Sequence, residues 1–283
     1  MRPWGYINAL VLALMGLAGT SVGDDQMGGQ RIRSLDYCAD QYALAIADPN
    51  QITALSVEAT MRHSYYRDRA EGIPQRSVSA ENILRDPADI ILRSWEGDHR
   101  LLSILKRADI DVVSIDSGSD HSVVKATFQT IGKALDRSGE ADAIIRNKQS
   151  IFDQLQALPT LNRSVLYITS GGYMAGEGTD IDHVLKLAGV LNAAADYGAV
   201  GWQPIALEQL ILEPPSVFVA GFFDTRDPAW FNWSLVRHPS VGRLMREVPT
   251  IQVPGALLSC GALFQGEAAA FIRTAIQDYK GAS

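Results

Sequence analysis

The segment "ENILRDPADIIL" at residues 81–92 has a counterpart later in the chain, "EQLILEPPSVFV" at residues 208–219. Both begin with Glu, place Leu or Ile three residues on and Pro six residues on, and open an apolar run nine residues on. This order of residues predicts a short helix, a proline turn and a buried strand. Because the unit returns after 127 of 283 residues, the chain is predicted to contain two lobes of similar architecture.

Composition limits the classes of protein that this chain can belong to. It is 47% hydrophobic and 20% charged, which suits one large domain or two small ones with ordinary cores. The formal net charge is −7 and no basic run is present. Nucleic acid is therefore not expected as a partner, because such binding needs clustered positive charge.

The N-terminus has the features of an export signal. Arg2 precedes the apolar run "ALVLALMGLAG" at residues 9–19, and small residues follow at 20–23. The run is shorter than the roughly 20 residues that span a bilayer. We expect residues 1–23 to be a signal peptide cleaved after Gly23, which would leave a soluble periplasmic protein. A membrane anchor or a buried strand is the alternative.

Strand and helix patterns alternate along most of the chain. Apolar runs at residues 31–36, 51–56, 88–94 and 111–116 are typical of strands, with helical spacing at 39–48 and 99–108. The alternation resumes with strands at 164–170, 216–222 and 250–255 and a terminal helix at 266–280. This order predicts parallel β-α-β units. The glycine-containing stretches 171–179 and 197–205 are expected to be loops.

The middle of the chain, residues 119–158, carries no strand pattern. Apolar spacing there predicts two helices, the second with Ser138 as its N-cap. A helix of about 20 residues is about 30 Å long, enough to cross a small domain. We therefore expect a helical connector at 119–158 between an N-terminal lobe at 24–118 and a C-terminal lobe at 159–283.

Four segments in this order point to one family. They are "RIRSLDYCADQYALAIADPNQITALS", "SAENILRDPADIILRSW", "YITSGGYMAGEGTDIDHVLKLAGVLNAA" and "GWQPIALEQLILEPPSVFVAG". From about Arg31 to its end, the chain resembles the cobalamin-type periplasmic substrate-binding proteins of ABC importers, a class that also binds ferric siderophores and haem. The resemblance implies a monomer of two pseudo-symmetric α/β lobes joined by a single long rigid helix, with a ligand cleft between the lobes.

The same resemblance implies a role for Glu81 and Glu208, which open the repeated segment. Members of the family carry one exposed Glu on each lobe, and the pair docks into arginine pockets on the two subunits of the permease dimer. An arginine fork binds a carboxylate bidentately, and a pseudo-twofold protein suits a twofold partner. Alternatively, each Glu only stabilises a helix N-terminus.

Aromatic residues are frequent where the predicted strands end. Ligands of parallel α/β lobes contact the loops beyond the carboxyl ends of the strands, and exposed aromatic side chains favour cover by a ligand or a neighbour. Ordinary packing beneath a loop is the alternative for each. We expect ligand-binding side chains at Tyr37, Tyr65, Tyr66, Trp95, Tyr173, Trp202, Arg226 and Trp230.

Aromatic side chains on both sides of a cleft suit a wide, flat and partly apolar ligand. The resemblance favours cobalamin or a related corrinoid first, a ferric siderophore second and haem third. Tyr65, Tyr66 or His63 would then serve as an axial ligand of haem iron. A protein-bound metal ion is not expected, because the five histidines show no ligand-type spacing. No cofactor is expected either.

Cys38 and Cys260 are the only cysteines in the chain. In an oxidising compartment they can form one disulfide, which would tie the two lobes together. We predict this bridge. The alternative is a pair of reduced thiols, buried apart or facing the ligand or a metal.

Enzyme motifs are not evident. The stretch "TSGGYMAGEG" lacks the Gly-Lys-Ser/Thr ending of a phosphate-binding loop, and Ser170 lies outside a G-x-S-x-G elbow. We therefore predict a periplasmic receptor, not an enzyme, that captures a bulky metal chelate and delivers it to an ABC permease in the inner membrane. An exported ligand sensor without a role in transport is the alternative.

Overall fold

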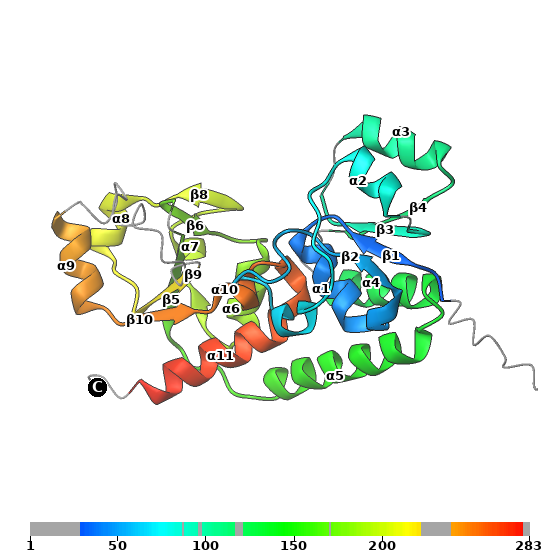
Figure 1. The fold of residues 1–283 in the computed structure, drawn as a ribbon. Coiled ribbons are helices and arrows are strands. Elements are labelled where there is room, and N and C mark those ends of the chain that lie inside the picture. Colours follow the sequence, from blue (N-terminus) through cyan, green and yellow to red (C-terminus); the bar gives the residue numbers. More distant parts are fainter. Residues whose placement is uncertain are drawn as a thin grey trace, which may run out of the picture.

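The computed structural model describes residues 29–86, 88–95, 98–116, 121–169, 171–221 and 239–279. Two α/β lobes lie side by side, with helices α5 (Ser138–Gln156) and α11 (Gln265–Asp278) along one side of the molecule (Figure 1). The expected signal peptide at residues 1–23 lies outside the described residues. Within the described ranges, no helix is long and apolar enough to cross a membrane.

The N-terminal lobe contains a four-stranded parallel sheet in the order β2-β1-β3-β4. Its strands are β1 (Ile32–Ser34), β2 (Ile52–Ala54), β3 (Ile90–Arg93) and β4 (Asp111–Ser114). Its helices are α1 (Tyr37–Ile46), α2 (Ala80–Arg85), α3 (His99–Arg107) and α4 (His121–Ala134), with 3₁₀ turns η1 (Pro49–Gln51) and η2 (Arg67–Ala70). Every residue of β3 is buried, as its continuous apolar run predicts.

The C-terminal lobe repeats this parallel order in β7-β5-β9-β10. These strands are β5 (Ser164–Ile168), β7 (Leu191–Asn192), β9 (Val217–Gly221) and β10 (Thr250–Val253). Its helical segments are α6 (Asp180–Leu187), α7 (Ala193–Asp196), α8 (Leu207–Leu212), α9 (Pro239–Glu247), α10 (Gly255–Leu258) and η4 (Gly261–Phe264).

The repeated sequence segments occupy equivalent places in the two lobes. Helices α2 and α8 both have six residues and begin 127 residues apart. The strands that follow them, β3 and β9, begin 127 residues apart as well. The prediction of two pseudo-symmetric α/β lobes is therefore confirmed.

The structure differs from the sequence-based expectation in two local features. The stretches 171–179 and 197–205, expected to be loops, contain β6 (Tyr173–Ala175) and β8 (Trp202–Pro204), which pair antiparallel and extend the second sheet beside β5. Three residues are too few to show a strand period. The N-cap of α5 is Arg137, so Ser138 is the first residue inside the helix.

Helix α5 joins the cores of the two lobes. Its first half contributes Ala141 and Ile145 to the N-terminal core, and Leu155 near its end packs in the C-terminal core. Helix α4, which lies in the expected connector, packs with the N-terminal core through Val124 and Phe128. A single helix therefore links two hydrophobic cores.

A second segment also crosses between the lobes. Residues 260–264 follow α10 and place Cys260, Leu263 and the fully buried Phe264 in the core of the N-terminal lobe. The ammonium group of Lys148 on α5 donates to the Leu263 carbonyl oxygen at 2.7 Å and to Glu267 Oε1 at 2.9 Å. The C-terminal part of the chain is thus built into the first lobe.

A buried carboxyl group links the helix α1 to both neighbouring strand ends. Asp40 accepts hydrogen bonds from the Ser34 hydroxyl, the Ser56 amide at 2.9 Å and the Ser56 hydroxyl at 2.6 Å. Burial raises the pKa of Asp40 to about 6, although the hydrogen bonds act in the opposite direction. The folded protein therefore holds this proton more tightly than the unfolded chain does.

We expect the substitution Asp40→Asn to flatten the pH dependence of stability. Because the folded-state pKa exceeds the usual 3.8, the proton on Asp40 favours folding at pH 4, and this contribution is lost as the pH rises through 6. Between pH 4 and pH 6 the wild type should lose about 2 kcal/mol relative to the variant. Urea unfolding at several pH values measures this, with the exposed Asp153→Asn as the control. Parallel curves for wild type and Asp40→Asn would contradict it.

Candidate functional site

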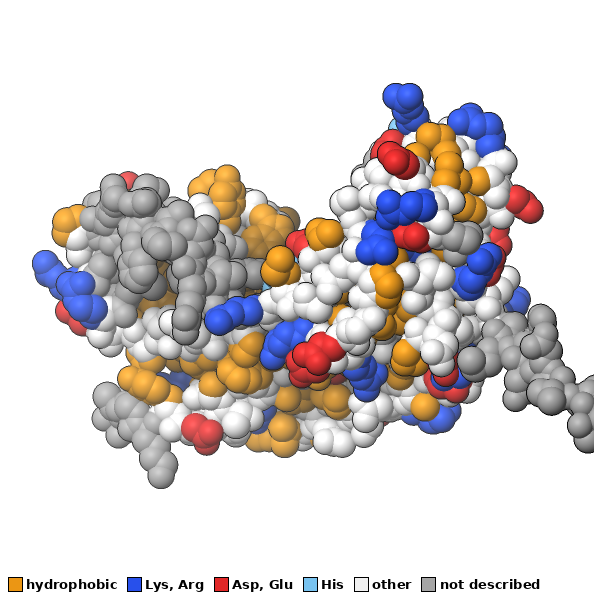
Figure 2. All heavy atoms as spheres, in the orientation of Figure 1, with side chains coloured by type: hydrophobic (Ala, Val, Ile, Leu, Met, Phe, Trp, Pro, Cys, Tyr) orange, Lys and Arg blue, Asp and Glu red, His pale blue; other side chains and the backbone are white. Residues whose placement is uncertain are grey.

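A cavity of about 560 Å³ is lined by residues from both lobes, and in Figure 2 the surface is hollowed between the lobes. On the N-terminal side, Tyr37, Ser94 and Asp116 follow the carboxyl ends of β1, β3 and β4. The C-terminal lobe contributes the N-terminal turn of α6, Trp202 of β8 and the segment after α10. The cavity thus lies where parallel α/β sheets place their ligands.

Asp36 organises the N-terminal wall of the cavity. Its carboxylate caps α1 by accepting from the amides of Cys38 at 3.1 Å and Ala39 at 2.9 Å. It also accepts from the Ser94 amide at 2.7 Å and the Ser94 hydroxyl at 2.6 Å. The loops that follow β1 and β3 are therefore held together, which fixes the backbone on which Tyr37 stands.

The Tyr37 side chain is half-buried in this wall. Its ring lies edge-on to the ring of His63, with centroids 5.3 Å apart. Burial, with the negative charges of Asp36, Glu58 and Asp180, raises the pKa of Tyr37. The phenol therefore stays protonated at neutral pH and presents a hydroxyl group that both donates and accepts hydrogen bonds.

Trp202 and Asp180 form the opposite wall. The indole of Trp202 is 47% exposed and packs edge-to-face on the buried ring of Tyr167, with centroids 5.9 Å apart. Thr179 caps α6 by accepting from the Asp182 amide at 3.1 Å, which places Asp180 at the start of the helix. Burial raises the pKa of Asp180. An apolar face and a carboxyl group therefore lie together on this lobe.

A disulfide between Cys38 and Cys260 links the two walls. The two Cα atoms are 5.2 Å apart, and the cysteines are separated by 222 residues in the sequence. Both residues line the cavity. Nearby, the Ser259 hydroxyl donates to the His63 carbonyl oxygen at 2.7 Å. The covalent bond and this hydrogen bond join the segment after α10 to the N-terminal lobe.

The structure brings together two of the expected ligand-binding aromatic residues, Tyr37 and Trp202. Tyr65 and Tyr66 follow β2 but pack on Phe264, with ring centroids 4.2 Å and 6.0 Å away. They therefore support the contact between the lobes, and neither is among the residues that line this cavity.

The remaining expected residues lie apart from these. Trp95 follows Ser94, and its ring is 5.7 Å from the guanidinium carbon of Arg93. Tyr173 is 47% exposed on β6. Trp230 and Arg226 lie outside the described residues.

Two carboxyl groups of the cavity, Asp116 and Asp180, were not among the ligand-binding residues predicted from the sequence. A signal was present, because Asp116 follows the fourth strand and Asp180 follows a glycine-containing stretch. Among the described residues, the lining includes these two carboxyl groups and neither Lys nor Arg. A separate hollow of about 540 Å³, between the loop after β2 and the start of α10, includes Arg62 and Arg67.

The described lining of the cavity offers two carboxyl groups and no histidine. In the described ranges, no group of three or more His, Cys, Asp or Glu side chains is placed to hold an ion. An aromatic wall on each lobe with carboxyl groups between them instead suits a compact organic molecule or chelate.

Comparisons with known proteins give the class of this fold. Residues 95–221 match the model of a family described as periplasmic binding protein. No curated protein matches the sequence.

Solved structures of periplasmic binding proteins superpose over most of the chain. The haem-binding protein HutB of Vibrio cholerae has a TM-score of 0.74 at 21% identity, over 87% of this chain and 98% of HutB. The haem-binding protein RhuT of Roseiflexus sp. RS-1, in apo form, has a TM-score of 0.68 at 20% identity, over 89% and 99% of the two chains.

A third structure is the haem-binding protein BhuT in complex with two haems. Its TM-score is 0.70 at 20% identity, over 88% of this chain and 98% of BhuT. These likenesses show the fold. The resemblance to periplasmic substrate-binding proteins noted in the sequence is confirmed, and the chain has their two-lobed fold.

We expect the double substitution Cys38→Ser and Cys260→Ser to lower the free energy of unfolding by about 2–5 kcal/mol. The bond closes a loop of 222 residues, so its loss mainly frees the unfolded chain. Guanidinium unfolding of the variant and of the oxidised and reduced wild type measures the effect. The reduced wild type serves as a matched control and should resemble the variant. Equal stability of all three would contradict the prediction.

Proposed function

We propose that this protein is the binding component of an ABC importer in the periplasm, where it captures a metal chelate between its lobes and delivers it to a permease. The observation that carries the proposal is the cavity of about 560 Å³ between Tyr37 and Trp202, one from each lobe. This volume lies within the range of about 300–1,000 Å³ for small-molecule sites. The family match and the fold support the same class.

The charge of the cavity favours one kind of chelate. Asp116 and Asp180 bring carboxyl groups to the lining, and no basic side chain accompanies them among the described residues. An anion would leave its charge unpaired beside them, which is costly in a partly dry site. We infer that the preferred ligand is a ferric chelate of neutral or positive charge, such as a hydroxamate siderophore complex.

Haem is the second candidate. Its support is that HutB, RhuT and BhuT are haem-binding proteins of the same fold. The carboxylates of haem would then need the guanidinium groups of Arg62 and Arg67 in the neighbouring hollow. Cobalamin, the ligand that the resemblance in sequence favours first, has no specific support from these comparisons.

A titration of the mature protein tests the ligand. We expect ferrioxamine B, a cationic ferric trihydroxamate, to bind one-to-one and quench tryptophan fluorescence. Haemin and cyanocobalamin should bind more weakly. Trp202→Ala should weaken binding at least about tenfold, because it removes one aromatic wall.

The control is the substitution Tyr279→Ala. Tyr279 is an exposed aromatic residue that directly follows α11. This variant should bind as the wild type does. Tighter binding of haemin than of ferrioxamine B would make haem the ligand and overturn the charge argument. Undiminished binding by Trp202→Ala would remove this cavity as the site.

Two exposed glutamates support delivery to a twofold partner. Glu81 and Glu208 are each the second residue of a six-residue helix, α2 in one lobe and α8 in the other. In Figure 1 both helices lie on the upper side of the molecule, opposite α5. We propose that these carboxylates dock on arginine residues of the two permease subunits.

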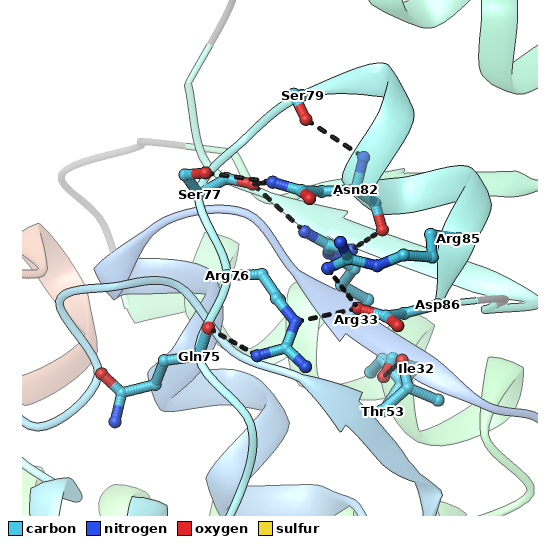
Figure 3. Close-up of polar contacts among 10 residues, drawn as sticks. All are labelled: Ile32, Arg33, Thr53, Gln75, Arg76, Ser77, Ser79, Asn82, Arg85 and Asp86. Atoms are coloured by element: carbon cyan, nitrogen blue, oxygen red, sulfur yellow. Dashed lines mark hydrogen bonds and ion pairs between the residues drawn. The ribbon is translucent and has the colours of Figure 1, made fainter.

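Helix α2 is held in place by a network of polar contacts (Figure 3). Ser79 caps the helix through the Asn82 amide at 3.1 Å. Arg33, fully buried on β1, donates to the carbonyl oxygens of Asn82 at 2.7 Å and Ser77 at 3.3 Å. Burial lowers the pKa of Arg33. Because Arg33 on β1 holds α2 in place, Glu81 lies on a helix of fixed position.

We expect the double substitution Glu81→Lys and Glu208→Lys to reduce uptake of the bound chelate by at least about tenfold while its affinity for the protein stays unchanged, because each lysine would meet an arginine. Uptake by cells that carry the transporter and a parallel fluorescence titration measure the two quantities. Glu140→Lys on α5 is the matched control, since its helix lies on the opposite side. Normal uptake by the double variant would favour a sensor without a transport role.

A further inference from the structure

A second cavity lies between helices α4, α5 and α6, apart from the residues of the ligand cavity. Its volume is about 620 Å³. The lining includes Lys125 on α4, Phe152 on α5 and Lys186 on α6, so it draws on both lobes and on the helix that connects them. The docking helices α2 and α8 contribute nothing to it.

The polar groups of this cavity favour an anion. Its lining includes two lysines, two histidines and three glutamines, and no carboxylate among the described residues. Two carboxylates, one on α5 and one on α6, accept hydrogen bonds from residues of the lining. Asp153 accepts from Gln149 at 2.8 Å, and the buried Asp182 accepts from Lys186 at 2.8 Å and Asn192 at 3.0 Å.

The ammonium group of Lys125 is the main positive charge in the lining of this cavity. It is exposed on α4, and no ion pair of the described residues involves it. Lys186 shares its charge with Asp182, so the two lysines together leave a net positive charge. An ammonium group is a strong point-charge donor to a carboxylate.

An aromatic pair forms an apolar part of the lining. The ring of His121 stacks on Phe152, with centroids 4.0 Å apart and planes 27° apart. Leu187 lies in the same lining. A flat apolar group can pack against such a surface, whereas a fully hydrated anion such as phosphate cannot use it.

We propose that this cavity is a second binding site, which takes a small aromatic carboxylate with its charge at Lys125 and its ring against Phe152. The site is independent of the chelate that the first cavity takes. It shares two elements with that cavity. Helix α6 begins at Asp180 in the first lining and carries Lys186 in the second, and helix α4 contributes Val124 to the first and Lys125 to the second.

Calorimetric titration of the full protein with benzoate, at constant ionic strength, tests the proposal. We expect saturable binding, a dissociation constant about tenfold higher in Lys125→Glu, and a smaller increase in Lys125→Gln. The matched control is Lys133→Glu, which makes the same charge change at an exposed position on the same helix outside the lining. It should bind benzoate as the wild type does.

Inorganic phosphate is titrated in parallel and should bind more weakly than benzoate. Circular dichroism and thermal unfolding of each variant establish that the fold is retained. Absence of saturable benzoate binding would overturn the proposal. So would equal losses in the Lys125→Glu and Lys133→Glu variants, or tighter binding of phosphate than of benzoate.

Discussion

The packing of residues 260–264 into the core of the N-terminal lobe is the contact on which the arrangement of the two lobes depends. Phe264 is fully buried there, Tyr65 stacks on it, and Lys148 donates to the carbonyl oxygen beside it. The Cys38–Cys260 bond adds a covalent tie at the same place. Residues 260–263 of this junction also line the ligand cavity, so the segment that packs in the N-terminal core contributes directly to the cavity wall.

The fold was predictable because its main signals are local. The strand at residues 90–93, which begins with three apolar residues, is buried at every position, and the strand 127 residues later is its counterpart in the second lobe. By contrast, β6 and β8 have three residues each and pair with one another across more than twenty-five residues. Such short strands form because a partner strand lies beside them, and the local sequence carries no signal of that partner.

The site was predictable in part for the same reason. The rule that ligands lie beyond the carboxyl ends of parallel strands led to Tyr37, which lines the cavity. Tyr65 and Tyr66 satisfy the same rule, but their loop is long enough to reach Phe264, and packing there determines their direction. The long-range contact between residues 65 and 264 has no signature in either segment. Asp116 and Asp180 also follow a strand and a glycine-containing stretch, but the cavity that brings them together forms only where the two lobes meet.

The position of Phe264 in the first lobe also governs the order in which the chain can fold. The N-terminal sheet ends with β4 at Ser114, yet the core around it is completed only by residues near the end of the sequence. A chain that emerges N-terminus first would therefore hold an unfinished first lobe until residue 264 has followed. Contacts of such long sequence separation form slowly and late. The two lobes have separate sheets, but the core of the first lobe includes residues from near the end of the chain.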